Sequence, residues 1–421
     1  MSSAVATRGA LALRPGEARA FALSFLYFFL LLASYFMVRP LRDSLAAGLG
    51  ADQIKYLSTA VFLTMLAIVP VFGWLASRVP RSRLLPGIYA FFVAHLLAFA
   101  IAFRIDPEHE WVARVFYVWL GVFNMFVVSV FWSFMADVWR EEQGRRLFGA
   151  IAAGGSLGGL LGPALTKLLV DDVGLGGIAL VSALLLAGTL AAIAGLRRHA
   201  HDPDGAAPAR LDEPVGGEIL AGLSRLVRSP FLLGIAGLIV VGTLLGMVIY
   251  IEMARLVAET YATPAERTAF YAERDIWVNG ISLVLQLLVV GRLTTWFGVR
   301  PTLVGAGLLA VLAFSTLAFV PVLGMLVVAN VLMRATEFGV GKPARDMLYT
   351  VVDPETKYKV KNVIDTAVLR GSDVVTGWAH GALAALGLGL AGFAGVGAVL
   401  ALLLVGIAWA VGTGYRRRGG T

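Results

Sequence analysis

Residues 331–380 read VLMRATEFGVGKPARDMLYTVVDPETKYKVKNVIDTAVLRGSDVVTGWAH and place charged side chains in stretches that their apolar flanks assign to a membrane. The charged residues concerned are Arg334, Glu337, Lys342, Asp365, Arg370 and Asp373. At the centre of a membrane helix each such charge costs about 3 kcal/mol when it faces lipid, so six would cost on the order of 18 kcal/mol. We therefore expect these side chains to face protein or water inside a helix bundle.

Helical spacing indicates how these side chains reach a shared interior. Arg334 and Glu337 are three residues apart, and Lys342 and Asp346 are four apart, so each pair can lie on one helix face. The second apolar stretch carries a similar stripe of polar residues that ends at His380. The two stretches thus predict two helices with polar stripes turned toward a water-accessible site.

The composition as a whole is that of an integral membrane protein. Apolar residues make up 58% of the 421 residues and charged residues only 15%, whereas soluble domains carry about 25% charged residues. The net charge of +8 comes from Lys and Arg spread over many loops, which argues against a nucleic-acid partner. With no Cys, no metal-ligand spacing and no phosphate-binding glycine loop, we expect no metal, no cofactor and no enzymatic activity.

Apolar runs of about 20 residues predict an all-α fold with twelve transmembrane helices. The predicted spans are 20–41, 54–77, 84–104, 111–137, 147–169, 176–196, 230–256, 275–296, 301–320, 322–348, 362–386 and 390–412. Clusters of Lys and Arg follow the even-numbered spans, which is typical of loops on the cytoplasmic side. We therefore expect both termini in the cytoplasm and the chain in the cytoplasmic (inner) membrane.

Residues 197–229 divide these spans into two sets of six. The segment is rich in Pro, Gly, Asp and Ala, which cannot bury a core, and it is predicted to be a cytoplasmic linker. The predicted organisation is a tail at 1–19, a six-helix bundle at 20–196, this linker, a second bundle at 230–412 and a tail at 413–421. The first 20 residues lack the apolar core of a removable signal peptide, so the first membrane helix is expected to direct insertion.

An internal repeat indicates that the two bundles are related by pseudo-symmetry. The turns at 73–81 (GWLASRVPR) and 291–300 (GRLTTWFGVR) share a Gly-x-Leu start and an Arg shortly beyond. Two such halves are the plan of many secondary transporters. The first turn resembles the loop signature of the major facilitator superfamily, with Ser77 in place of its acidic residue and Pro80 in place of its second Gly. The Gly-rich run 154–163 resembles the Gly-Pro motif of that superfamily and can also serve plain helix packing.

Several segments over most of the chain resemble the bacterial and plastid ATP/ADP translocases. Residues 39–45 (RPLRDSL) are similar to that family's Leu-Arg-x-x-Lys-Asp-Thr-Leu stretch, which places Arg42 where a substrate-binding Lys is found. Residues 342–373 resemble the family's tenth and eleventh helices, including Asp365 and Arg370. The chain departs from the pattern in its fourth helix, where the acidic residue is missing and Asn124 is one of the nearest candidates. The resemblance implies nucleotides as one class of substrate.

The predicted substrate is an anionic or zwitterionic small solute, because Arg can hold phosphate or carboxylate groups with two hydrogen bonds. The predicted substrate-binding residues are Tyr35, Arg42, Asn124, Arg334, Glu337, Lys342 and Arg370. The predicted gating or proton-coupling residues are Arg78, Arg81, Asp137, Asp365 and Asp373. A structural role is the alternative for each charge, as a snorkelling side chain for Arg42 and as ion pairs between helices for the others.

Charged residues at the outer ends of the seventh and eighth spans are interpreted as gate or interface residues. They are Glu252, Arg255, Arg274 and Asp275. His380 shares a stripe with Asp373, so proton coupling stays open beside a packing role.

The leading functional hypothesis is a secondary active transporter that works by alternating access. One alternative is proton-coupled efflux of a drug, a siderophore or a peptide-like compound. The other is a non-transporting membrane sensor or scaffold. The expected partners are a small solute and the lipid bilayer, and the chain is expected to act as a monomer.

Overall fold

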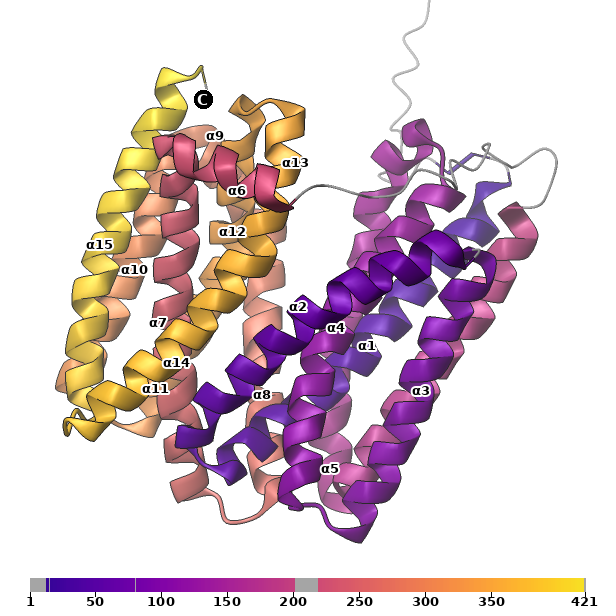
Figure 1. Cartoon of the computed structure of the whole chain (residues 1–421), viewed down its shortest axis with the longest axis horizontal. Helices are drawn as coiled ribbons and strands as arrows, with labels where there is room; N and C mark the ends of the chain where they lie inside the picture. The colour runs from indigo at the N-terminus through magenta and orange to yellow at the C-terminus, as the bar shows by residue number, and fades with distance from the viewer. Residues whose placement is uncertain (1–12, 15, 80, 201–218, 420–421) are drawn as a thin grey trace, which may run out of the picture. The chain divides into compact units, whose positions relative to one another are not determined.

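The computed structural model describes residues 13–14, 16–79, 81–200 and 219–419, and every regular element in these ranges is a helix, as predicted (Figure 1). The long helices of the first half are α1 (Glu17–Leu49), α2 (Ile54–Arg78), α3 (Arg81–Ile105), α4 (Glu110–Val138) and α5 (Glu141–Ala200). The second half contains α6 (Ile219–Arg228), α7 (Pro230–Thr260), α8 (Pro264–Val284), α9 (Val290–Phe297), α10 (Val299–Phe319), α11 (Leu323–Thr336), α12 (Lys342–Met347), α13 (Pro354–Val363), α14 (Leu369–Ala385) and α15 (Leu390–Arg417). Short 3-10 turns are η1 (Ala51–Gln53) and η4 (Leu348–Val351).

Ten helical stretches in the described ranges are long and apolar enough to cross a membrane. One of them, Arg146–Arg197, has 52 residues, and at about 1.5 Å per residue it is more than twice as long as one span of about 30 Å requires. Gly174 interrupts this stretch with φ 65°, a conformation that glycine adopts readily, so α5 supplies two consecutive spans. The charged helix α14 adds a further candidate, and the fold is thus consistent with the twelve predicted spans.

Several helices of the second half contain a π-helical turn, in which each N–H bonds five residues back. These turns are η2 (Leu285–Val289), η3 (Glu337–Gly341) and η5 (Ile364–Val368). A π turn adds one residue to the helix and rotates the side chains that follow by on the order of 100°. The polar stripes that regular spacing predicts therefore change register at η3 and at η5.

The helices form two compact units. The first lies within Met1–Pro40, Trp74–Pro107 and Leu120–Pro214, and the second lies within Leu41–Gly73, Glu108–Trp119 and Val215–Thr421. The second unit thus contains the end of α1, most of α2 and the start of α4 together with the helices of the second half. The predicted domain boundaries stay a prediction, and most of the predicted linker lies outside the described residues.

In the first unit, glycines of α5 allow a close approach to α1. A Cβ atom placed on Gly154 would lie 2.6 Å from the carbonyl oxygen of Phe25, and one on Gly162 would lie 2.6 Å from that of Ala33. One turn further along, the Thr166 hydroxyl donates a hydrogen bond to the carbonyl oxygen of Met37 at 2.7 Å. The Gly-rich run therefore serves as the packing surface for α1.

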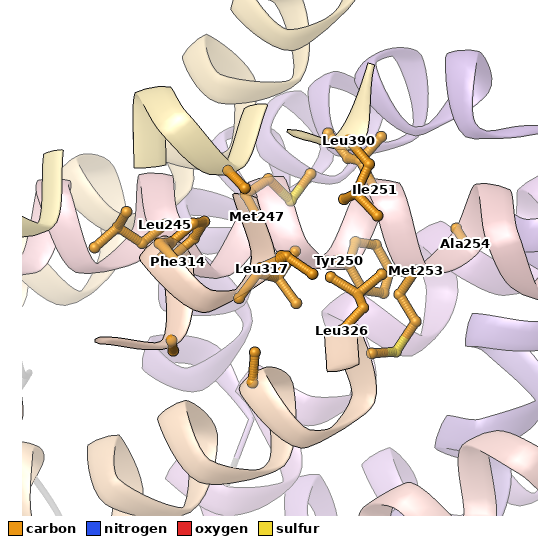
Figure 2. Packing of buried hydrophobic residues seen from close by; sticks show 14 of the residues in the cluster. Leu245, Met247, Tyr250, Ile251, Met253, Ala254, Phe314, Leu317, Leu326 and Leu390 are labelled. Atoms are coloured by element: carbon orange, nitrogen blue, oxygen red, sulfur yellow. The ribbon is translucent and has the colours of Figure 1, made fainter. Parts of the chain in front are cut away.

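In the second unit, apolar side chains gather around α7. Leu245, Tyr250 and Met253 of this helix are buried against Phe314 of α10 and Leu326 of α11 (Figure 2). In lipid such packing stabilises helix association through van der Waals contact rather than through exclusion of water. The core holds α7 in place and thereby positions the polar side chains that α7 carries.

Candidate functional site

The start of α8 is defined by its own sequence. The Thr263 hydroxyl accepts a hydrogen bond from the backbone N–H of Glu266, and the Glu266 carboxylate accepts one from the backbone N–H of Thr263. Residues 267, 271 and 274 then follow at spacings of four and three, which places them on one helix face. All three side chains on this face, including Arg274, are buried.

Asp43 of α1 is the centre of a buried charge network. Its Oδ1 accepts hydrogen bonds from Arg42 Nη2 at 2.6 Å and from the Tyr250 hydroxyl at 3.2 Å, and its Oδ2 accepts one from Arg274 Nη2 at 2.8 Å. Arg274 Nη2 also donates to Asp275 Oδ1 at 2.7 Å. The side chains of Asp43, Arg274 and Asp275 are at most 1% exposed. Two Arg and two Asp balance in charge, and this pairing is what makes their burial tolerable.

Aromatic rings cover the cations of this network. The Arg42 guanidinium lies 5.3 Å from the ring centre of Tyr117 on α4, and the Arg274 guanidinium lies 4.8 Å from that of Tyr271 on α8. Cation–π contacts of this kind become stronger where water is excluded. The rings therefore take over part of the role that water has around an exposed arginine.

Polar contacts continue from this network across the same end of the second unit. They join Ser44 Oγ to the Pro264 carbonyl oxygen (2.9 Å), Arg267 Nη2 to Glu108 Oε1 (2.6 Å) and Trp378 Nε1 to Thr59 Oγ1 (3.2 Å). A Cβ atom on Gly377 would lie 3.0 Å from the Cα atom of Lys55, so α14 and α2 also approach closely. The segments from α1, α2 and α4 are thus fastened to α7, α8 and α14 within one unit.

Several predicted substrate-binding residues lie together in this unit. Arg370 Nη1 donates to Asp373 Oδ2 at 3.3 Å, and Arg334 and Arg42 are also close enough to act electrostatically on the Asp373 carboxylate. Arg370 is 29% exposed and Asp373 is 23% exposed, in contrast to the enclosed Asp43. A partly accessible group of arginines with one carboxylate is suited to binding an anion.

Glu337 and Lys342 have different surroundings from those that regular spacing indicates. Glu337 Oε1 lies 2.7 Å from Arg345 Nη1, eight residues further along, and Asp346 Oδ1 lies 2.7 Å from Lys361 Nζ. Lys342 is exposed. For Glu337 the physical reason is the π turn η3, which begins at this residue and rotates the residues after it. For Lys342 it is the neighbouring helix α13, whose Lys361 pairs with the Asp346 carboxylate.

The other predicted site residues divide between the first unit and side chains outside the description. In the first unit, Tyr35 is buried on α1, Asn124 and Asp137 are half-buried on α4, and Arg78 is exposed at the end of α2. The side chains of Arg81 and Asp365 lie outside the described part of the structure. The assignments of all these residues to binding or gating stay predictions.

Sequence reasoning alone does not single out two features of the second unit. The first is Asp43. An acidic residue in an apolar helix needs a cation as its partner, and this is the feature of the sequence that could have identified it. The second is a pair between α7 and α14, in which His380 Nε2 lies 2.9 Å from Glu252 Oε1 and both side chains are buried. The imidazole stacks on the ring of Phe393 with centroids 4.0 Å apart.

A helical membrane protein that gathers its charged side chains among helices has the design of a solute transporter. Known proteins with similar sequences and structures belong to this class. The chain belongs to the major facilitator superfamily, whose family model matches residues 20–344. It is also a distant relative of ADP,ATP carrier protein 1 of Chlamydia trachomatis, with 23% identity over 416 residues that cover 82% of this chain and 78% of the carrier. The carrier protein 1 of Chlamydia muridarum is 23% identical over 417 residues, with the same coverage.

Solved transporter structures share the fold at low sequence identity. A POT family transporter in complex with 5-aminolevulinic acid has a TM-score of 0.64 at 13% identity. The match covers 94% of this chain and 96% of the transporter chain. A mutant of the nucleoside transporter NupG has a TM-score of 0.60 at 12% identity, with 95% and 99% covered. A bacterial homologue of the human lysosomal transporter Spinster has a TM-score of 0.59 at 14% identity, with 96% and 99% covered. The predicted major facilitator fold is therefore confirmed.

Proposed function

We propose that the protein is a secondary active transporter of the inner membrane that exchanges an anionic, nucleotide-like solute by alternating access. The observation that carries this proposal is the partly exposed Arg370–Asp373 pair at 3.3 Å, on whose carboxylate the charges of Arg334 and Arg42 also act. Arginine guanidinium groups hold phosphate oxygens in pairs of hydrogen bonds and keep their charge at every physiological pH. The distant relationship to ADP,ATP carriers supports nucleotides as the first substrates to test.

The buried network around Asp43 acts in this proposal as the gate on the outer side. With both termini in the cytoplasm, the end of α1, the start of α4 and the α7–α8 junction lie on the outer face of the membrane. Asp43, Tyr250 and Arg274 join α1 to α7 and α8, and Arg42 on the ring of Tyr117 adds α4. Transport requires these contacts to break when the site opens outward and to form again when it closes.

Counterflow in proteoliposomes tests the proposed substrate. Vesicles loaded with ADP are expected to take up labelled ATP, and Arg370→Gln or Arg334→Gln is expected to reduce uptake about tenfold or more through the loss of a charge-assisted hydrogen bond. Arg114→Gln is the matched control, because Arg114 is also 29% exposed and pairs with Glu110. Uptake that all three variants retain equally would remove the arginine cluster from the binding site, and absence of exchange with any nucleotide would refute the substrate class.

The buried pair of Glu252 and His380 supports proton-coupled efflux as a second candidate function. An imidazole 2.9 Å from a carboxylate inside a transporter is a place where a proton can be held. The two functions differ in what drives them. Uptake that needs internal anion and ignores a pH gradient supports exchange, whereas transport driven by a pH gradient across otherwise equal solutions supports proton coupling.

A further inference from the structure

A cavity of about 370 Å³ lies at one end of the second unit. Its lining residues belong to α6, the start of α7, the start of α13 and the end of α15, among others, and Figure 1 shows these helices. Its lining includes three cations, Arg225, Arg228 and Arg418, and one carboxylate, Asp353. Apolar side chains, among them Phe231, form another part of the wall. The cavity thus combines cationic groups with an apolar surface.

The three arginines differ in how far their charge is already balanced. Arg225 donates to the carboxylate of Glu355 at 2.8 Å and to the hydroxyl of Thr356 at 3.0 Å. Arg418 donates to the Gly414 carbonyl oxygen, and its guanidinium lies 4.5 Å from the ring centre of Phe231. Within the described ranges neither Arg228 nor Arg418 forms an ion pair. These two side chains leave the cavity able to attract an anion.

Side chains of α9, α10 and α15 indicate where the membrane surface lies along the second unit. Trp296 and Trp409 are 71% and 55% exposed, and the guanidinium of Arg300 lies 4.1 Å from the ring centre of Trp409. Exposed Trp beside Arg is typical of the boundary between the acyl chains and the headgroups. On α6, Leu226 is buried in the protein while Val227 is 57% exposed, as expected for a helix that lies along this boundary.

We propose that this cavity binds the phosphate group of an anionic phospholipid. Arg228 and Arg418 would hold the phosphate, and the apolar wall at Phe231 would contact the glycerol and the first part of the acyl chains. Basic pockets between membrane helices at the headgroup level bind anionic lipids by this combination of charge and apolar contact. The Asp353 carboxylate repels the phosphate, so removal of its charge should strengthen lipid binding. The inference is independent of the transported solute.

Native mass spectrometry of the full-length protein in detergent tests the proposal. With added phosphatidylglycerol, the wild type is expected to retain lipid adducts, and Arg228→Gln combined with Arg418→Gln is expected to reduce them about tenfold. Arg416→Gln combined with Arg417→Gln is the matched control, since it removes the same charge from residues outside the cavity lining. Equal losses in the two double variants would show binding to general surface charge and overturn the proposal.

Two further arms of the experiment test the role of charge in the cavity and the kind of anion that it holds. Asp353→Asn should increase lipid retention, because Asn keeps the hydrogen bond to the Thr356 N–H at the start of α13 and removes the negative charge. Retention of phosphatidylcholine to the same extent, or displacement of phosphatidylglycerol by excess inorganic phosphate, would contradict a site for anionic lipid. Arg228→Gln alone, at an exposed position, serves if the double variant does not fold.

Discussion

Arg274 Nη2 lies 2.8 Å from Asp43 Oδ2, although the two residues are 231 positions apart in the sequence. Both side chains are 1% exposed. The pair joins α1 to α8, and Arg42 and Asp275 balance its charges. A buried charge without its partner is costly. Any motion that parts α1 from α8 therefore has to release both charges together and pair them again together.

Removal of one partner is therefore expected to destabilise the protein more than removal of both. Arg274→Met leaves two buried carboxylates with one arginine and should lower the free energy of unfolding by about 3–5 kcal/mol. Arg274→Met combined with Asp43→Leu removes one charge of each sign, so the buried network is neutral again, and should recover part of that loss. Denaturant-induced unfolding in detergent measures both values.

The Arg114–Glu110 pair, which is partly exposed, provides the control for this cycle. Arg114→Met should change the free energy of unfolding by no more than about 1 kcal/mol, because an exposed ion pair contributes little. If the double variant at Asp43 and Arg274 is no more stable than Arg274→Met alone, the two side chains are not coupled as the structure indicates.

The sequence predicts the helices of this fold well because a membrane span must be a long apolar run, and that requirement is local. It also predicts a group of charges in the second half, since Arg334, Arg370 and Asp373 interrupt such runs. The sequence does not predict which charged side chains pair with each other. The pairing of Asp43 with Arg274 depends on contacts between distant segments, and no local pattern reports it.

The π turns explain why regular spacing fails for part of the candidate site. Eight residues of a regular α-helix would leave Arg345 about 80° away from the face of Glu337, yet Glu337 bonds Arg345 across η3. A π turn arises where packing with neighbouring helices outweighs the preference for i to i−4 hydrogen bonds, so it has no simple sequence signal. At η3, Gly339 packs against Leu285 of η2, and the Phe338 carbonyl oxygen accepts a hydrogen bond from Gln286.

The close approach of α5 to α1 predicts a large difference between two glycines of the same helix. At Gly162 a Cβ atom would meet backbone atoms of α1, so Gly162→Ala should lower the free energy of unfolding by about 1–3 kcal/mol through overpacking. At Gly149 no atom lies within 4 Å of that position, so Gly149→Ala should be neutral or stabilising through its higher helix propensity. Thermal unfolding in detergent compares the two, and a Gly162→Ala midpoint at or above that of Gly149→Ala would contradict the packing.

Two carboxylates at the start of α13 predict a loss of stability in acid. The backbone N–H of Thr356 lowers the pKa of Asp353 below its ordinary value of 3.8, and hydrogen bonds from Lys359 and Arg225 lower the pKa of Glu355 below 4.5. Since the folded pKa values are the lower ones, their stabilisation is fully present above about pH 5 and is lost as the pH falls through the folded values.

The test of this linkage compares thermal unfolding midpoints at pH 7 and at pH 3. Asp353→Asn combined with Glu355→Gln should lose less stability between these pH values than the wild type loses. Asp171→Asn combined with Asp172→Asn removes the same number of exposed carboxylates from α5 and should leave the wild-type difference in place. An unchanged pH difference in the first double variant would show that the hydrogen bonds at α13 do not contribute.

The contact between His380 and Glu252 predicts that transport depends on this one side chain. Glu252, Arg255 and the ring of Phe393 surround the buried imidazole. Tyr250, two residues before Glu252, bonds Asp43 of the proposed gate, so a change in the pair bears on α7 where the gate is fastened. We expect His380→Gln to reduce the rate of exchange about tenfold, because it takes a hydrogen-bond partner from a buried carboxylate.

His95 supplies the comparison for this experiment. Its Nδ1 lies 2.8 Å from the carbonyl oxygen of Phe91 on its own helix, and no carboxylate bonds it within the described residues. His95→Gln should therefore keep the transport rate of the wild type, measured as initial counterflow rates in proteoliposomes with the same pH on both sides. A wild-type rate in His380→Gln would leave the pair with Glu252 as a structural contact between α7 and α14 that transport does not need.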